Sequence, residues 1–262
     1  MNTGTKWSTL ALGVSGQVAT VKFDRPEHRN GVTTTMVTEL HDLLHSVASD
    51  SSISVLMLTG AGSTFCPGAD LSQSPTAEPS QLPDIEAYQS ATLLHEMPQV
   101  TVAAINGACA GAGLAWASAC DIRLASAGAR FSTAFLQVGL AGELGTAWTL
   151  TRVVGGAMAR DLYLLPRKFG TDDALRIGFV SRVFPDETFA ADTTAIIAEL
   201  ASRDPRALRT MKRNFVDAEQ LSLRRYVEVE SARQLAFFTG EARKDTIRRL
   251  TTQRSVLGTA ST

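Results

Sequence analysis

The chain of 262 residues lacks the features that mark a membrane protein or a disulfide-rich protein. No apolar run approaches the roughly 18 to 20 residues that a membrane-spanning helix needs. Its three cysteines, Cys66, Cys109 and Cys120, form no C-x-x-C pair and leave an odd count, which argues against a disulfide framework or a thiolate zinc site. We therefore expect a soluble protein with no membrane partner, whose cysteines are small core residues.

Neither a basic segment nor a long apolar segment occurs in the amino-terminal sequence MNTGTKWSTLALG, so no export signal is expected and we predict cytoplasmic localisation. Residues 1–202 hold 12 Lys and Arg against 19 Asp and Glu, whereas residues 203–262 hold 13 against 7. This basic segment is either a solvated helix face or a surface for a polyanionic ligand or an acidic neighbouring subunit. No recognised nucleic-acid-binding motif accompanies the charge, so we expect no nucleic acid partner.

Apolar periodicity predicts an α/β fold. Short β-branched runs at 18–23, 53–59 and 100–105 are typical of strands. Apolar residues at helical spacing predict a helix over 33–48, and composition favours another over 113–120. Strands that alternate with helices indicate an α/β domain built from a repeated strand-turn-helix unit.

The remainder of the chain divides into a loop and a helical end. Residues 72–83, SQSPTAEPSQLP, contain three prolines and three serines, which predicts a loop. Beyond about residue 192 the pattern is helical and charged. The predicted helices are 193–201, 205–220 and 221–239. We therefore place a boundary between an α/β core, residues 1–195, and a helical region, residues 196–262.

Several motifs for cofactor chemistry are missing although the chain has 20 glycines. The spacing of Gly107, Gly111 and Gly113 departs from the dinucleotide-binding fingerprint, and neither a phosphate-binding loop nor a G-x-S-x-G nucleophile elbow occurs. His41 and His45 are spaced like the ligands of H-E-x-x-H, but the base position holds Asp and both histidines flank the apolar stripe of a helix. We expect no nicotinamide, ATP or metal cofactor.

Two glycine-rich segments, 60–71 (GAGSTFCPGADL) and 106–121 (NGACAGAGLAWASACD), each follow a predicted strand. In the second, a helix is expected to begin near Ala112, where the first backbone N–H groups lack intrahelical acceptors. If the turn at Gly68 and Ala69 lies beside it, two N–H groups converge on one carbonyl oxygen and stabilise an enolate. The alternative is that both segments serve only close packing.

Four separated segments carry a resemblance to a known family. They are FDRPEHRN (23–30), FCPGADL (65–71), AAINGACAGAGLAWASACDIRLAS (103–126) and GLAGELGTAWTLTRVVG (139–155). In this order they resemble the enoyl-CoA hydratase/isomerase family, or crotonase superfamily, over about residues 15–190. The segment FFTGEARKD (237–245) resembles the family's terminal helix but lacks its usual Glu-Gly pair.

The resemblance implies a crotonase-like α/β spiral of repeated strand-strand-helix units. It also implies that the carboxy-terminal helical region builds a homotrimer, or a hexamer as a dimer of trimers. The expected substrate is an acyl-CoA or enoyl-CoA ester, with coenzyme A as part of the substrate and no separate cofactor.

Site residues follow from the same resemblance. Ala69 and Ala112 match the family's two oxyanion-hole donors, and Ala112 replaces a frequent glycine. Further residues match the segments that hold the adenine and pantetheine parts of coenzyme A: Arg25, Arg29, Cys66 and Gly68.

The two glutamates that a hydratase of this family uses to activate water are absent. Ala115 and Phe135 occupy the matching positions, and neither side chain can transfer a proton. With Trp148, they are expected either to line an apolar substrate pocket or to belong to the core. The ordinary two-glutamate hydration mechanism is therefore not expected here.

Glu143 remains, in GLAGELGTAW, and matches the single acid/base of peroxisomal-type enoyl-CoA isomerases. It also matches the nucleophilic Asp of 4-chlorobenzoyl-CoA dehalogenases, but Tyr88 stands where that route needs a histidine. We predict isomerisation of an enoyl-CoA, with Glu143 moving one proton beside a stabilised enolate. The alternatives are a hydratase with a non-standard site and a non-catalytic acyl-CoA-binding protein.

Overall fold

The computed structural model describes residues 7–70, 72 and 83–239. The chain divides into two compact units, residues 1–209 and 210–262, which are described separately. The predicted loop at 72–83 falls almost wholly outside the described residues, as does most of the segment 237–245.

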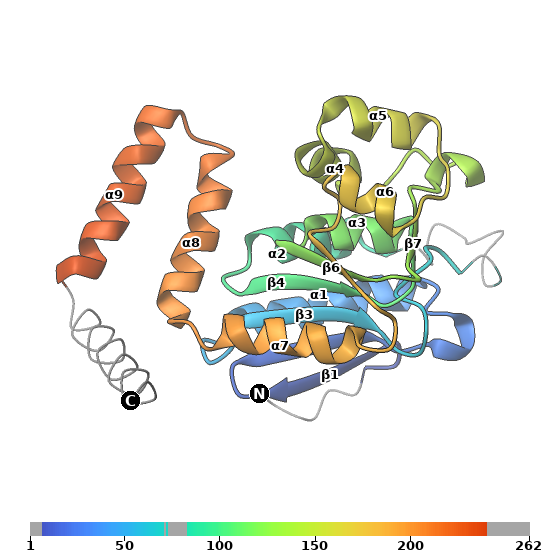
Figure 1. Cartoon of the computed structure of the whole chain (residues 1–262), viewed down its shortest axis with the longest axis horizontal. Coiled ribbons are helices and arrows are strands. Elements are labelled where there is room, and N and C mark those ends of the chain that lie inside the picture. Colours follow the sequence, from blue (N-terminus) through green and yellow to red (C-terminus); the bar gives the residue numbers. More distant parts are fainter. Residues whose placement is uncertain (1–6, 71, 73–82, 240–262) are drawn as a thin grey trace, which may run out of the picture. The chain divides into compact units, whose positions relative to one another are not determined.

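A six-stranded sheet forms the centre of the first unit, with strand order β1-β2-β3-β4-β6-β8 (Figure 1). Its strands are β1 (Leu10–Ser15), β2 (Val18–Phe23), β3 (Val55–Gly60), β4 (Val100–Ile105), β6 (Ile122–Ser126) and β8 (Arg182–Phe184). Strands β1 and β2 pair antiparallel, and the other neighbours pair parallel. A second, parallel pair consists of β5 (Ala108–Ala110) and β7 (Arg130–Ser132). Parallel pairing brings the carboxyl ends of successive strands to one edge, where the glycine-rich segments begin.

Helices connect and cover these strands. The helices of the first unit are η1 (Pro26–His28), α1 (Thr34–Ser49), η3 (Ile85–Gln89), α2 (Ser90–Glu96), α3 (Ala112–Ala119), η4 (Phe135–Val138), α4 (Thr146–Val154), α5 (Gly156–Leu164), α6 (Thr171–Arg176) and α7 (Phe189–Ala201). Helix α8 (Pro205–Ala218) begins in the first unit and continues into the second, which also holds α9 (Leu223–Thr239). Arg233 of α9 donates to Asn214 at 2.7 Å and pairs with Asp217 at 2.5 Å.

Alternate side chains of β3 enter two different cores. Leu56 joins the larger core with α1, α2 and α3, whereas Val55 joins a smaller core with Ile197 of α7. Because successive side chains of a strand point to opposite faces, helices cover both faces of the sheet. In the larger core Trp116 of α3 is fully buried and stacks on Phe23 of β2, with ring centroids 5.3 Å apart.

The structure confirms the predicted α/β class and most of the predicted elements. The runs at 18–23 and 100–105 are strands over those same residues, and the run at 53–59 becomes β3. The helices predicted over 33–48 and 113–120 are α1 and α3, each displaced by one residue. Three buried, unbridged cysteines confirm the prediction that these residues are core residues.

The three helices predicted after residue 192 are present as α7, α8 and α9, although α7 begins earlier, at Phe189. The predicted boundary at 195/196 falls inside α7, and Ile197 in that helix is buried against the sheet. The role of residues 196–262 in oligomerisation, as trimer or hexamer, stays a prediction. None of the helices in the described part of the chain combines the length and apolar character needed to cross a lipid bilayer.

Candidate active site

The two glycine-rich segments lie against each other at the carboxyl edge of the sheet. The N–H of Cys66 donates to the carbonyl oxygen of Ala108 at 3.0 Å, and the N–H of Ala110 donates to that of Cys66 at 2.9 Å. Both segments then turn at a glycine with positive φ, +96° at Gly68 and +51° at Gly111. A Cβ at Gly111 would lie 3.3 Å from the Cα of Gly68. The predicted juxtaposition of the two turns is therefore present.

Ala69 and Ala112, the predicted oxyanion donors, directly follow these two glycines. The carbonyl of Gly68 and the N–H of Asp70 both bond to Val32, each at 2.9 Å, so the N–H of Ala69 takes no part in this pairing. Ala112 is the first residue of α3, where an N–H has no intrahelical acceptor. Among the described residues neither N–H has a hydrogen-bond acceptor. Two unpaired donors in adjacent turns are the arrangement that an oxyanion site requires.

Cys66 holds the two turns together from inside. Its side chain is fully buried, and burial raises the pKa of its thiol to about 12, against opposing hydrogen bonds from the N–H groups of Gly68 and Gly113. A methyl group at Gly113 would collide with the carbonyl oxygen of Cys66. The thiol therefore stays protonated at neutral pH, and Cys66 shapes the site by packing between the turns.

Arg25 and Asp70 form a buried ion pair that braces the first turn. Arg25 Nη2 lies 3.0 Å from Asp70 Oδ2, and each side chain is 8% exposed. Hydrogen bonds from Ser72 and Arg25 lower the pKa of Asp70. Because Arg25 also donates to the carbonyl of Gly31, its guanidinium is engaged inside the protein. Arg25 therefore binds Asp70, the residue after Ala69, and its charge is not free in solvent.

Arg29 differs from Arg25 in its surroundings. It is exposed, with a φ of +55°, and its guanidinium has no hydrogen-bond or ion-pair partner within the described ranges. Asn30, next to it, is fully buried and donates to the carbonyls of Ala61 and Thr64 at 2.9 and 2.6 Å. Of the two predicted arginines, Arg29 is thus the one available to a phosphate group.

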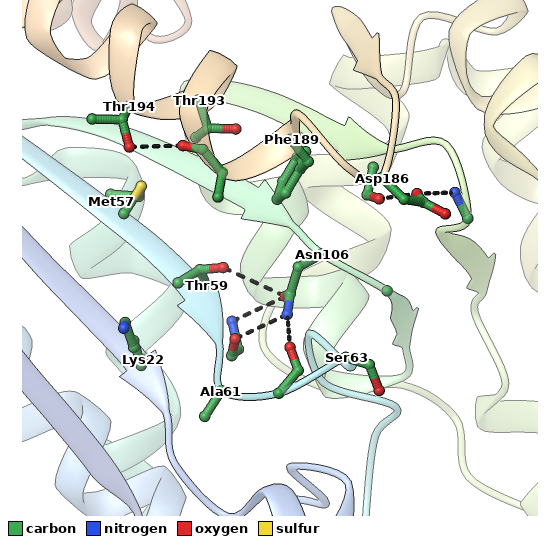
Figure 2. Close-up of a pocket in the computed structure, with 16 residues that line it drawn as sticks. Lys22, Met57, Thr59, Ala61, Ser63, Asn106, Asp186, Phe189, Thr193 and Thr194 are labelled. Carbon is green, nitrogen blue, oxygen red and sulfur yellow. Dashed lines mark hydrogen bonds between the residues drawn. The ribbon is translucent and has the colours of Figure 1, made fainter.

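Asn106 joins the ends of the two central strands. Its Nδ2 donates to the carbonyl oxygens of Gly60 and Gly62, both at 2.9 Å, and its Oδ1 accepts from the N–H of Gly60 at 3.2 Å (Figure 2). Asn106 lines a cavity of about 760 Å³ on the α7 side of the sheet. The turns at Gly68 and Gly111 do not line this cavity. Asn106 therefore fixes the strand ends from which both turns start.

A run of left-handed residues carries Glu143 between η4 and α4. The φ angles are +111° at Gly142, +54° at Leu144 and +63° at Gly145. The carbonyl of Glu143 accepts from the N–H of Thr146 at 3.0 Å and from its Oγ1 at 2.6 Å. A non-glycine residue at positive φ costs free energy and is found where the surroundings fix the backbone.

The carboxylate of Glu143 is half-buried, and burial raises its pKa. In the part of the chain that the structure describes, neither carboxylate oxygen has a hydrogen-bond or ion-pair partner. Burial is the main cause that raises the pKa of Cys66, Tyr88 and Tyr163, and the negative charge of Glu143 adds to it. Since Cys66 lies between the two turns, Glu143 is near enough to them for its charge to act on that thiol, and it is not a fully solvated surface residue.

Ala115 and Phe135, predicted at the positions of the missing glutamates, lie in apolar surroundings. Ala115 is fully buried in α3. Phe135, in η4, stacks on Tyr163 with ring centroids 5.8 Å apart, and its Cε1 would lie 3.9 Å from a Cβ at Gly111. Phe135 therefore lies between the second turn and Tyr163, a residue that no motif in the sequence predicts.

Trp148 has different surroundings from the apolar wall expected for it. Its side chain is 43% exposed, and the guanidinium of Arg152 lies 3.5 Å from the ring centroid. The ring of His95 packs edge-on against it at 5.2 Å. The indole is thus held on the outer side of α4, and its contact with a substrate stays a prediction.

The other histidines form no metal cluster. The rings of His41 and His45 pack edge to face, 4.6 Å apart, on α1. Residues 7–70, 72 and 83–239 contain no group of three or more histidine, cysteine, aspartate and glutamate side chains placed to hold a metal ion.

Comparison with known proteins gives matches over most of the chain. Residues 13–255 match the protein-family model described as enoyl-CoA hydratase/isomerase. A Mycobacterium tuberculosis protein named "Probable enoyl-CoA hydratase EchA12" is 34% identical over 230 residues, 84% of this chain and 81% of that protein. The 1,2-epoxyphenylacetyl-CoA isomerase of Escherichia coli is 32% identical over 219 residues, 81% of this chain and 84% of that enzyme.

A solved structure from Thermobifida fusca, in complex with CoA, has the same fold. Its TM-score is 0.83 at 28% identity, and the match covers 90% of this chain and 95% of that chain. The named relatives thus include both a hydratase and an isomerase.

Proposed function

The chain belongs to the enoyl-CoA hydratase/isomerase family, and from this premise we propose that it moves a carbon–carbon double bond within an enoyl-CoA thioester, using Glu143 as its single acid/base. The proposal is supported by the half-buried, unpaired carboxylate of Glu143, whose charge acts on Cys66, and by the unpaired N–H groups of the two turns that Cys66 packs between. Ala115 and Phe135, the residues that the resemblance matches to a hydratase's glutamates, supply no second carboxylate.

Binding places the thioester carbonyl oxygen against the N–H groups of Ala69 and Ala112. When a proton leaves the carbon next to the carbonyl, negative charge collects on that oxygen, and the two donors stabilise it. Removing one such donor from an oxyanion site typically lowers the rate by about 10²- to 10³-fold. The ion pair of Arg25 and Asp70 and the buried Cys66 hold the donors in place before the substrate arrives.

Glu143 moves the proton. Its carboxylate removes a proton from C2 of a 3-enoyl thioester, the electron pair of the C–H bond forms a double bond between C1 and C2, and the carbonyl π electrons move to the oxygen to give a dienolate. The protonated Glu143 then gives the proton to C4, the double bond lies between C2 and C3, and the acid is a carboxylate again. No water is consumed. A raised pKa suits this cycle, because a base works best when its pKa lies near the working pH.

The coenzyme A part of the substrate is expected beside Arg29, whose exposed guanidinium suits a phosphate. The Thermobifida fusca structure in complex with CoA supports this class of ligand. Arg25 takes part indirectly, because its guanidinium is bonded to Asp70.

The test is to incubate the protein with short, long and aromatic enoyl-CoA esters in heavy water. Isomerisation predicts the absorbance of a conjugated enoyl thioester and a product mass that shows no added water. A product with one added water would contradict the proposal and indicate a hydratase with a non-standard site. Tight binding of the esters with neither absorbance change nor deuterium uptake would indicate a non-catalytic acyl-CoA-binding protein.

A further inference from the structure

Tyr163 of α5 connects three parts of the candidate active site. Its ring stacks on Phe135 at an interplanar angle of 29°, and Phe135 in turn reaches the turn at Gly111. Its hydroxyl faces the turn that carries Glu143. No motif in the sequence marks this tyrosine, because it is twenty residues from the acid along the chain.

Gly142 packs directly on this phenol. A Cβ at Gly142 would collide with the Tyr163 hydroxyl and lie 3.1 Å from both Cε1 and Cζ of the ring. The φ of +111° at Gly142 also lies in the region that favours glycine. The Tyr163 phenol therefore packs directly against Gly142, the residue before Glu143.

A second link runs through Thr146. The Thr146 Oγ1 donates to the carbonyl of Glu143 at 2.6 Å. Burial raises the pKa of Tyr163, and a hydrogen bond with the Thr146 side chain opposes this effect. Tyr163 thus contacts the Glu143 turn on its amino-terminal side, at Gly142, and its phenol lies near the Thr146 side chain on the carboxy-terminal side.

We propose that Tyr163 is the positioning residue for Glu143: its ring and hydroxyl keep the 142–146 turn in the conformation that directs the carboxylate toward the Gly68 and Gly111 turns. The proposal rests on the function proposed above. The turn contains two glycines, so without the phenol its backbone gains conformational freedom. The carboxylate then reaches water and loses both its alignment and its burial.

The test compares Tyr163→Phe and Tyr163→Leu with the parent protein. Tyr163→Phe keeps the stacking on Phe135 but removes the hydroxyl from Gly142 and Thr146. We expect kcat to fall about 10- to 100-fold with KM within about twofold, as for a misplaced catalytic group. The acidic limb of the kcat profile should move to lower pH, because a more hydrated Glu143 has a lower pKa. Tyr163→Leu should show a larger loss. Tyr226→Phe, which removes a phenol bonded to Glu230 on α9, is the matched control.

The outcomes separate this proposal from the proposed function. If Glu143→Gln is inactive while Tyr163→Phe keeps the parent kcat and pH profile, the positioning role is wrong and the function stands. A Tyr163→Phe variant with lower kcat but an unmoved acidic limb would also overturn the positioning role, since lost stability alone would then explain it. If Glu143→Gln is as active as the parent, the proposed function fails, and the positioning role fails with it.

Discussion

Replacing Ala112 by proline removes one oxyanion donor with little change elsewhere. Ala112 is the first residue of α3, and proline is well tolerated there because the N–H has no intrahelical acceptor. Proline disfavours the helical region for the residue before it, but Gly111 has a φ of 51° and a ψ of −124°, outside that region. The side chain of Ala112 is buried, so folding must be checked directly.

The expected loss follows from the chemistry of the site. Ala112→Pro should lower kcat by about 10²- to 10³-fold, or about 3–4 kcal/mol of transition-state stabilisation. The free energy of unfolding should change by no more than about 1 kcal/mol, since no helical hydrogen bond is lost. Binding of a saturated acyl-CoA should weaken less than kcat, because contacts with the coenzyme A part remain.

The assay follows the absorbance of the conjugated enoyl thioester, with urea unfolding to confirm that the variant is folded. Ala112→Gly is the matched control, because it keeps the N–H and should retain the parent kcat within a few-fold. A folded Ala112→Pro variant with the activity of Ala112→Gly would refute the assignment of Ala112 as a donor.

Three further predictions concern charge. Burial raises the pKa of Glu143, so kcat/KM should fall on acidification at a pH above that of an ordinary glutamate, about 4.3; an acidic limb at or below that value in the pH–rate profile would contradict this. Because the pKa of Glu143 is higher in the folded than in the unfolded protein, protonation of Glu143 favours the folded state. This contribution to the free energy of unfolding is complete below the pKa of Glu143 in the unfolded chain and is lost as pH rises through its pKa in the folded protein. Glu143→Gln should therefore raise Tm at neutral pH, with the gain shrinking at low pH, whereas the exposed control Glu199→Gln should not. Asp70→Asn should lower the free energy of unfolding by about 3 kcal/mol, because the buried Arg25 loses its counter-charge. A decrease of less than about 1 kcal/mol in urea unfolding would show that the ion pair does not stabilise the fold.

The sequence predicts the elements whose own side chains carry the signal. Long β-branched runs identify β2, β3 and β4, and helical periodicity identifies α1. Strands β5, β7 and β8 have only three residues each, too few for an alternating pattern to appear. Helices α4, α5 and α6 are short and follow one another closely, so their boundaries depend on packing that no local pattern records.

The same distinction holds for the site. The turns at Gly68 and Gly111 are visible in the sequence because glycine permits their backbone conformation, and the family resemblance assigns the donors after them. The burial of Arg25 against Asp70 could not be predicted, because the two residues lie 45 positions apart and meet only in the folded chain. Tyr163 was missed for the same reason: its contact with Gly142 arises from the way α5 packs on the preceding turn.

The central claim is that a lone carboxylate beside two main-chain donors moves the proton. The most direct measurement is the turnover of Glu143→Gln on the best enoyl-CoA substrate, together with a titration of the variant with a saturated acyl-CoA. Conjugation and solvent deuterium uptake should disappear in this variant, while its acyl-CoA affinity should stay within a few-fold of the parent. Undiminished turnover by a variant that binds acyl-CoA normally would contradict it.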